Sequence, residues 1–234
     1  MKEVNLWFLF SDILIKTAII MPYKIGDNAP ISLKAIFPDD WQYMLSVYKG
    51  FISSTGSKAA NEDLLLTLLE IGVKFGQRLS RLDMNGFVEI GCGLAIPSLT
   101  LSKLGNTGVK AIDIDPKILA CAEDLKNRLG CELEIQCSDI FENSPKLQKR
   151  ELLIAEKPAS YKKSILEVEY NIRNRCAIEG HNLALIPSYL GTDTMESYSE
   201  RCKKYEKKLR QVGFKVENKQ ICEPLPFRWL IAIK

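Results

Sequence analysis

The sequence has little of several features that mark common functional classes. It has one histidine among 234 residues, and its seven cysteines include no C-x-x-C pair. An odd number of scattered cysteines gives neither a zinc site nor a disulfide framework, so we predict no metal centre and a cytoplasmic, reducing location. The formal net charge of +3 is too small to indicate nucleic acid as a partner by itself.

The chain also lacks a long uncharged apolar run. Its most apolar stretch, residues 4–21, contains Asp12 and Lys16, and no small-residue cleavage site follows. A membrane span needs about 20 largely uncharged residues, and a signal peptide needs a basic start and a small-residue exit. We therefore expect no stable membrane span. We predict that this segment packs on the domain or on a second copy of the chain in a homodimer, and attachment to a membrane surface is the alternative.

From residue 86 onward, short apolar runs alternate with helical patterns. Such alternation predicts a mostly parallel sheet covered by helices on both faces. The last two predicted strands are joined by a link too short for a parallel crossover, so the final strand should run antiparallel. The fold class is thus a doubly wound α/β fold with seven strands and a reversed C-terminal hairpin. The predicted strands are residues 86–91, 109–114, 131–137, 182–189, 213–222 and 227–234, with a further strand that begins at residue 151.

We predict two units. Residues 60–234 form the α/β domain, whose first helix begins near Asn61 as a plausible N-cap. Residues 1–59 form a helical N-terminal extension that could serve as a lid, a substrate cap or a dimerisation segment. Within it, Asp39 or Asp40 should open a short helix.

The stretch VEIGCGLAIPS, residues 88–98, joins a predicted strand to a predicted helix through Gly91 and Gly93. Ligands bind beyond the carboxyl ends of such strands, and glycines let the backbone approach them closely. A dinucleotide loop needs another small residue where Ile96 stands, and the charge of Glu89 is unfavourable beside a pyrophosphate. An acid here favours a ligand with an ammonium and a sulfonium, such as S-adenosylmethionine, over NAD.

Two further acids follow the next two strands. Asp113 ends the second strand, where a carboxylate can accept hydrogen bonds from a ribose diol, as it also does in NAD sites. Asp139 follows the third strand and could accept from the exocyclic amine of adenine, with Ile140 offering its N–H and apolar contact. Asp115 is predicted to be a helix N-cap. His181 lies at the start of a strand, away from the ligand edge, and is predicted to be structural.

These stretches resemble the class I, seven-strand, S-adenosylmethionine-dependent methyltransferases. The resemblance rests on VEIGCGLAIPSL, AIDIDPKIL, CSDIF and LLIAEKP, and covers about residues 60–234. It implies that the first motif holds the methionine end of the cofactor, the second its ribose and the third its adenine. The AEKP of the fourth motif, in place of N-P-P-Y, argues against amide and base acceptors. The implied cofactor-binding residues are Glu89, Gly91, Cys92, Gly93, Asp113, Ile114, Asp139 and Ile140.

The acceptor side is expected beyond the fourth strand. Glu156 ends that strand and could bind an acceptor ammonium or take a proton, although an ion pair with a neighbouring lysine is nearly as good an interpretation. Tyr161 is the second catalytic candidate. Further candidates for the acceptor pocket, from strand ends, helix ends and the terminal hairpin, are Ser188, Tyr189, Glu223, Phe227 and Arg228.

We predict a methyltransferase that acts on a nitrogen, oxygen or sulfur atom of a small molecule, because the aromatic extension suits a small, partly apolar acceptor. One alternative is methylation of a protein lysine or of RNA. Another is a non-catalytic relic of the fold that binds only the cofactor or a partner. The basic run at residues 201–210 is interpreted as the solvated face of a helix rather than an RNA contact.

Overall fold

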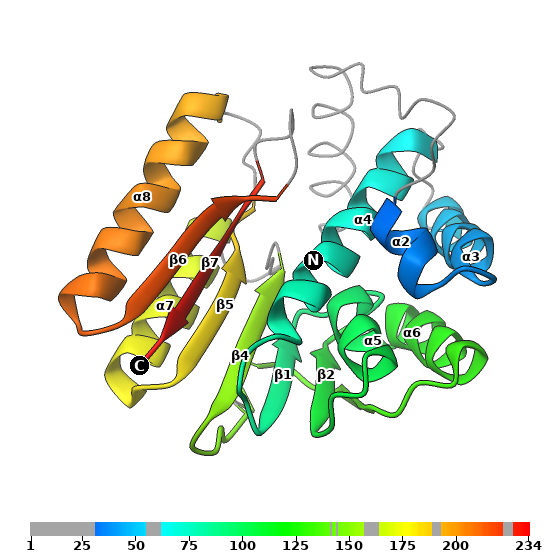
Figure 1. The fold of residues 1–234 in the computed structure, drawn as a ribbon, viewed down its shortest axis with the longest axis horizontal. Helices are drawn as coiled ribbons and strands as arrows, with labels where there is room; N and C mark the ends of the chain where they lie inside the picture. Colours follow the sequence, from blue (N-terminus) through cyan, green and yellow to red (C-terminus); the bar gives the residue numbers. More distant parts are fainter. Residues whose placement is uncertain are drawn as a thin grey trace, which may run out of the picture.

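The computed structural model describes residues 31–54, 62–140, 142–143, 145–156, 164–188, 193–221 and 227–234. In this part of the chain, seven strands form one sheet in the order β3-β2-β1-β4-β5-β7-β6 (Figure 1). The predicted seven-strand α/β fold is confirmed. The strands are β1 (Gly86–Ile90), β2 (Val109–Asp113), β3 (Glu134–Cys137), β4 (Glu151–Glu156), β5 (Asn182–Ile186), β6 (Lys215–Gln220) and β7 (Arg228–Ile233).

Strands β1 to β5 pair in parallel, whereas β7 pairs antiparallel with both β5 and β6. The last strand is therefore reversed, as the short link before it predicted. Because the carboxyl ends of parallel strands meet at one edge, the residues that follow β1, β2, β4 and β5 share that edge. The register there places Glu156 of β4 beside Ile186 of β5.

Helices cover both faces of the sheet (Figure 1). On one face, α4, α5 and α6 share a core with strand residues such as Phe87 and Leu152, while α2 and α3 pack on α4 and α6. On the other face, α7 and α8 pack over the alternate residues Val88 and Leu153. The helices are α2 (Ile31–Ile36), α3 (Trp41–Ser54), α4 (Glu62–Leu79), α5 (Ile96–Lys103), α6 (Pro116–Leu129), α7 (Ile165–Glu179) and α8 (Met195–Gln211).

The ends of α6 follow from local signals in the sequence. The Asp115 side chain accepts a hydrogen bond from the N–H of Lys117 at 2.9 Å, so it is the predicted N-cap. Pro116 occupies the first turn, and Gly130 ends the helix in the left-handed region at φ 61°. The predicted N-cap of α4, Asn61, lies outside the described residues.

Helix α4 packs closely against α5 because two glycines of α4, Gly72 and Gly76, face α5. A Cβ atom on Gly76 would lie 2.6 Å from Thr100 Cβ and 2.8 Å from the carbonyl oxygen of Pro97. A Cβ on Gly72 would lie 2.9 Å from Ile96 Cγ2 and 3.3 Å from Glu156 Oε2. The two glycines thus let α4 contact the helix that follows the loop, and bring it to the end of β4.

We expect Gly76→Ala to destabilise the protein, because the added methyl group overlaps α5 backbone and a β-branched side chain. The net loss should be about 2 kcal/mol of unfolding free energy. Gly50→Ala is the matched control: Gly50 is also helical, and no heavy atom lies within 4 Å of its added Cβ. That change should stabilise by about 0.5–1 kcal/mol. Chemical denaturation of both variants checks this, and equal effects would contradict the proposed close approach.

The described part of the N-terminal extension packs on the α/β domain. The Leu33 N–H donates to Glu70 Oε2 of α4 at 2.8 Å, and the Tyr43 hydroxyl donates to Asp124 Oδ2 of α6 at 2.5 Å. Asp40 precedes α3, as predicted, and its carbonyl accepts from the N–H of Met44. The predicted homodimer segment, residues 4–21, lies outside the described residues. Among the described helices, none is long and apolar enough to cross a membrane.

Candidate functional site

The loop between β1 and α5 adopts a backbone conformation that few side chains tolerate. Gly91 and Gly93 have φ of 60° and 53°, and Ala95 also has a positive φ of 56°. No heavy atom of the described chain lies within 4 Å of a Cβ built on Gly91. The loop therefore presents bare backbone to open space, which a side chain at this position would fill.

Glu89 lies beneath this loop and is almost completely buried, with 1% of its surface exposed. Its Oε2 accepts hydrogen bonds from the Ser98 N–H at 3.1 Å and from the Ser98 hydroxyl at 2.5 Å. No hydrogen-bond donor of the described chain reaches its other oxygen, Oε1, which is also buried. An unpaired buried carboxylate oxygen is costly, and a cation beside it would remove that cost.

The environment of Glu89 favours its protonated form when no cation is present. Burial raises the pKa of Glu89 from its ordinary value of 4.5 to about 8. The hydrogen bonds from Ser98 oppose this shift, whereas negative charge on Glu156 and Asp113 adds to it. Asp113 and Glu156 therefore lie close enough for their charge to act on Glu89 at the carboxyl edge of the sheet.

Asp113 ends β2 and joins it to the glycine loop. One carboxylate oxygen accepts from the Gly93 N–H at 2.9 Å, and the other accepts from the N–H groups of Ile114 and Asp115 at 2.7 and 3.0 Å. Burial raises the pKa of Asp113, and these hydrogen bonds oppose the rise. The carboxylate predicted to bind a ribose therefore also fixes the shape of the loop.

The other predicted cofactor-binding residues lie around this pair. Cys92 is buried, its N–H donates to the Ile112 carbonyl, and burial raises the pKa of its thiol far above the ordinary value, so it fills space as a neutral side chain. The Ser138 N–H donates to the Asp113 carbonyl at 2.8 Å, which brings the segment after β3 to the end of β2. Asp139 begins a tight turn there, and Ile140 packs partly buried against the core.

On the acceptor side, Glu156 lies at the end of β4 as predicted. Tyr48 of α3 is close enough that charge on Glu156 adds to the rise in its pKa, which is caused mainly by burial. Tyr161, the second catalytic candidate, lies outside the described residues, as do Tyr189 and Glu223.

The remaining pocket candidates have other partners. The Ser188 N–H donates to the buried carboxylate of Glu169 at 2.6 Å, and Phe227 packs edge-on against the ring of Tyr198. Arg228 Nε donates to Asn218 Oδ1 at 2.7 Å, so the guanidinium of Arg228 lies along the terminal hairpin. Only the Ser188 backbone among these lies directly beyond a parallel strand, next to the end of β4.

Sequence reasoning missed Ser98 and Tyr48. Ser98 lies in the first turn of α5, nine residues after Glu89, where its N–H and hydroxyl both orient the buried carboxylate. A serine just after a glycine loop that follows a buried acid was the available signal. Tyr48 carried no local signal, because only the packing of α3 brings it towards Glu156.

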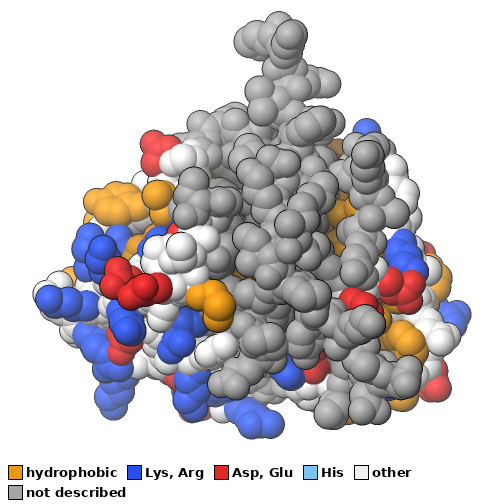
Figure 2. Space-filling model, turned by 90° about the horizontal axis from the view of Figure 1, so that it is seen from above, with side chains coloured by type: hydrophobic (Ala, Val, Ile, Leu, Met, Phe, Trp, Pro, Cys, Tyr) orange, Lys and Arg blue, Asp and Glu red, His pale blue; other side chains and the backbone are white. Residues whose placement is uncertain are grey.

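His181 and the basic run at residues 201–210 were both interpreted from the sequence as structural, and neither lies at the candidate site. His181 precedes β5, away from the carboxyl edge, and its Nε2 lies 3.1 Å from Glu179 Oε2. The basic run falls in α8, which buries Cys202, Tyr205 and Leu209 and exposes its lysines. Figure 2 shows lysine and arginine side chains gathered on the side of the molecule where Figure 1 places α8. This is the predicted solvated face.

No protein-family model matches the chain. Curated relatives do match, and the seven found are each named ribosomal protein L11 methyltransferase. The protein from Dictyoglomus thermophilum is 26% identical over 137 residues, which are 50% of this chain and 46% of the relative. That from Methylococcus capsulatus is 30% identical over 100 residues, 36% of this chain and 34% of the relative. The chain spans about half the length, or less, of the curated relatives it matches.

Solved structures share the fold. A ribosomal protein L11 methylase from Lactobacillus delbrueckii gives a TM-score of 0.53 at 16% identity, covering 72% of this chain and 79% of that one. A magnesium protoporphyrin IX methyltransferase from Synechocystis, solved with bound S-adenosylmethionine, gives 0.55 at 16% identity, covering 88% and 99%.

The comparisons correct the predicted acceptor. A small molecule was predicted as both substrate and main partner, and this prediction is wrong, because the sequence relatives are named for methylation of a ribosomal protein. They favour the protein alternative. The predicted enzyme class agrees with the names of all seven relatives. The predicted resemblance is confirmed, and the chain has the seven-strand fold of the class I S-adenosylmethionine-dependent methyltransferases.

Proposed function

We propose that this chain is an S-adenosylmethionine-dependent methyltransferase that methylates an amine nitrogen of a lysine in a protein acceptor. The observation that carries the proposal is the buried Oε1 of Glu89, which has no hydrogen-bond donor in the described chain. It lies next to a glycine loop whose open backbone leaves room for a ligand. A buried acceptor beside such a loop fits a ligand with a cationic end, and an ammonium group is the matching donor.

The remaining residues fit the other parts of the cofactor. Asp113 keeps lone pairs beyond its three backbone hydrogen bonds, and a ribose diol can donate to them. Asp139 and Ile140 are the candidates for adenine, because the segment after β3 is tied to the end of β2. When bound, the cofactor supplies an electrophilic methyl carbon on a sulfonium.

The charge of the site favours a cationic acceptor. Negative charge on Glu156 and Asp113 raises the pKa of Glu89, and no cation of the described chain contributes to that shift. Glu156, at the end of β4, is placed to attract a lysine ammonium and to accept its proton before the neutral amine attacks. The surrounding chain then aligns amine and methyl group and excludes water.

The protein acceptor itself is proposed from the names of the sequence relatives. The described part of the extension supports its role as a cap, because α3 brings Tyr48 towards Glu156. A cytoplasmic location is part of the proposal. In the described chain, six cysteines are free thiols, as a reducing compartment would keep them.

The acceptor is tested by incubating the chain and labelled S-adenosylmethionine with purified ribosomal protein L11. Ribosomal RNA and a pool of small amines are assayed in parallel. We expect label in the protein alone. Glu156→Gln should lower kcat by about 10²-fold because it cannot accept a proton, with little change in cofactor affinity. Label in RNA would replace the protein acceptor with the RNA alternative. Cofactor binding without transfer to any of the three would favour the non-catalytic relic.

A further inference from the structure

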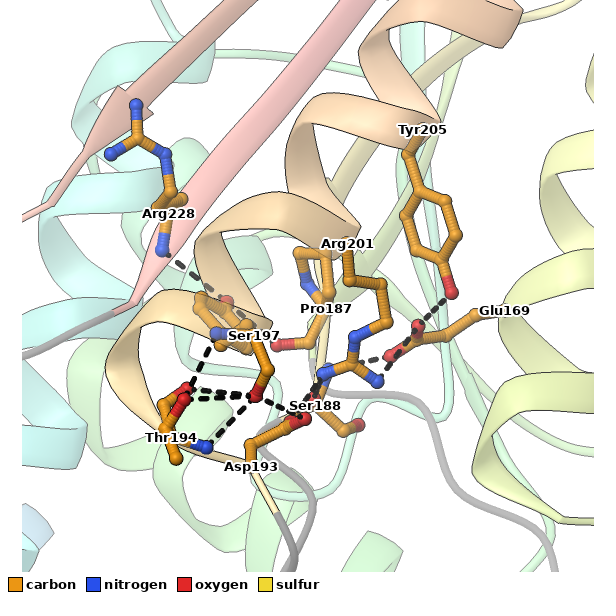
Figure 3. A network of polar contacts seen from close by, with 10 residues as sticks. Glu169, Pro187, Ser188, Asp193, Thr194, Ser197, Arg201, Tyr205 and Arg228 are labelled. Atoms are coloured by element: carbon orange, nitrogen blue, oxygen red, sulfur yellow. Dashed lines mark hydrogen bonds and ion pairs between the residues drawn. The ribbon is translucent and has the colours of Figure 1, made fainter.

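A buried polar network lies at the end of β5 (Figure 3), and it includes none of the residues assigned to the cofactor. Its centre is Glu169 of α7, which has no exposed surface. One carboxylate oxygen accepts from the Ser188 N–H at 2.6 Å, and the other accepts from the Tyr205 hydroxyl at 2.7 Å. Burying a charged carboxylate costs free energy, and apolar side chains would stabilise the packing of the helices as well. The network therefore calls for a role other than stability.

Arg201 of α8 completes the network by binding the carbonyl side of Ser188, whose N–H is bound by Glu169. Its Nη2 donates to the Ser188 carbonyl at 2.5 Å and to Asp193 Oδ2 at 2.8 Å, and its Nη1 lies 3.8 Å from Glu169 Oε2. The backbone of Ser188 is therefore held at its N–H by one helix and at its carbonyl by another (Figure 3). The Tyr198 hydroxyl also donates to the Pro187 carbonyl at 3.0 Å.

The clamped segment lies where an acceptor would bind. Pro187 and Ser188 directly follow β5, and the register pairs Ile186 with Glu156 at the end of β4. The site of proton acceptance proposed for Glu156 and the clamped backbone are thus neighbours at one edge of the sheet. Backbone that leaves a strand is usually mobile unless other groups hold it, and here two charged side chains from two helices hold one residue.

We propose that Glu169 and Arg201 are positioning residues, which hold the Pro187–Ser188 backbone as a fixed wall of the site for the protein acceptor. The inference rests on the proposed function. Neither side chain has to touch the acceptor, because each acts through the main chain of Ser188. Loss of either should therefore weaken use of the acceptor and leave cofactor binding intact.

Kinetics of four variants test the proposal: Arg201→Met, Glu169→Leu, Glu169→Gln and Leu209→Ala. Glu169→Gln is the conservative variant, because its amide oxygen can still accept from Ser188 while its NH2 group donates to Tyr205. Leu209 is a buried residue of the same helix as Arg201, and its truncation destabilises α8 without touching Ser188. Each variant is measured for Tm, cofactor Kd, and KM and kcat for the acceptor.

We expect Arg201→Met and Glu169→Leu to lower kcat/KM for the acceptor by about tenfold or more, with cofactor Kd unchanged. Glu169→Gln should restore most of the loss. Leu209→Ala should lower Tm but leave acceptor KM unchanged. Hydrogen exchange of the Ser188 amide should quicken in Glu169→Leu, which checks the clamp without relying on turnover.

Other results would overturn the inference. If the loss of kcat/KM is proportional to the loss of Tm in all four variants, the network only stabilises the fold. An unchanged kcat/KM for the acceptor in a folded Arg201→Met protein would also exclude the positioning role. If the wild type transfers no methyl group to protein, the proposed function itself has failed and this inference fails with it. If the wild type methylates protein and the variants have the same kcat/KM for the acceptor, the inference is rejected and the proposed function stands.

Discussion

Glu89→Gln should abolish useful cofactor binding while removing a source of instability at alkaline pH. The variant keeps the size of the side chain and its acceptor for Ser98, but it cannot carry charge opposite an ammonium. Removing one partner of a buried charge pair costs about 3–5 kcal/mol, so we expect cofactor affinity to fall by about 10²–10⁴-fold. Calorimetric titration with S-adenosylmethionine measures this loss.

The stability of the cofactor-free protein should change in the opposite direction. Because the folded-state pKa of Glu89 is raised from 4.5 to about 8, the folded protein holds a proton that the unfolded chain releases. The stabilisation from this proton is fully present below pH 4.5 and is lost as the pH rises through 8. The loss amounts to on the order of 5 kcal/mol, and the glutamine variant should lack it.

Thermal unfolding between pH 5 and pH 9 compares the two proteins. A smaller fall in Tm with rising pH for Glu89→Gln, together with lost cofactor affinity, would separate a functional role from a structural one. A variant that loses stability at every pH, with cofactor affinity intact, would show that Glu89 merely supports α5. Ser98→Ala, which removes one of the donors to Oε2, should lower cofactor affinity less than Glu89→Gln does.

Asp113→Asn has the second largest expected effect. Both carboxylate oxygens of Asp113 accept backbone N–H groups, and the Gly93 N–H approaches from the opposite side to those of Ile114 and Asp115. An asparagine must place its NH2 group against one of these donors. We expect a stability loss of about 1–3 kcal/mol and a cofactor affinity lower by at least about tenfold.

Asp115→Asn is the matched control for that change. It lies two residues away and caps α6 through one hydrogen bond to the Lys117 N–H, a role that asparagine fills equally well. Its stability and cofactor affinity should be nearly those of the wild type. Equal losses in both variants would mean that removing any charge near the loop weakens cofactor binding. The proposed hydrogen bonds of Asp113 would then not explain its effect.

Much of the fold could be predicted because its signals are local. The apolar runs of β1, β2 and β4 are bounded by turn residues, and α6 carries its own proline, cap and glycine. The reversed β7 followed from the length of one connection. These features depend on neighbours in sequence, so periodicity and turn chemistry are sufficient to find them.

The features that escaped prediction depend on tertiary contacts. Gly72 and Gly76 look like defects in a helix, and only the approach of α5 explains them. Glu169 and Arg201 look like ordinary polar residues of helices, yet both are directed inward at the backbone of one residue, Ser188. Sequence motifs identified the residues around the cofactor site, but the acceptor depends on a surface assembled from distant segments, which is why a small molecule was wrongly predicted.

The central claim is that the loop at Gly91 and Gly93, with the buried carboxylate of Glu89, binds a cationic sulfur cofactor. Calorimetric titration of the purified chain with S-adenosylmethionine, S-adenosylhomocysteine and NAD tests it most directly. The account predicts binding of both sulfur ligands in the micromolar range or tighter, loss of that binding in Glu89→Gln, and none with NAD. Binding of NAD, or of none of the three, would contradict the account.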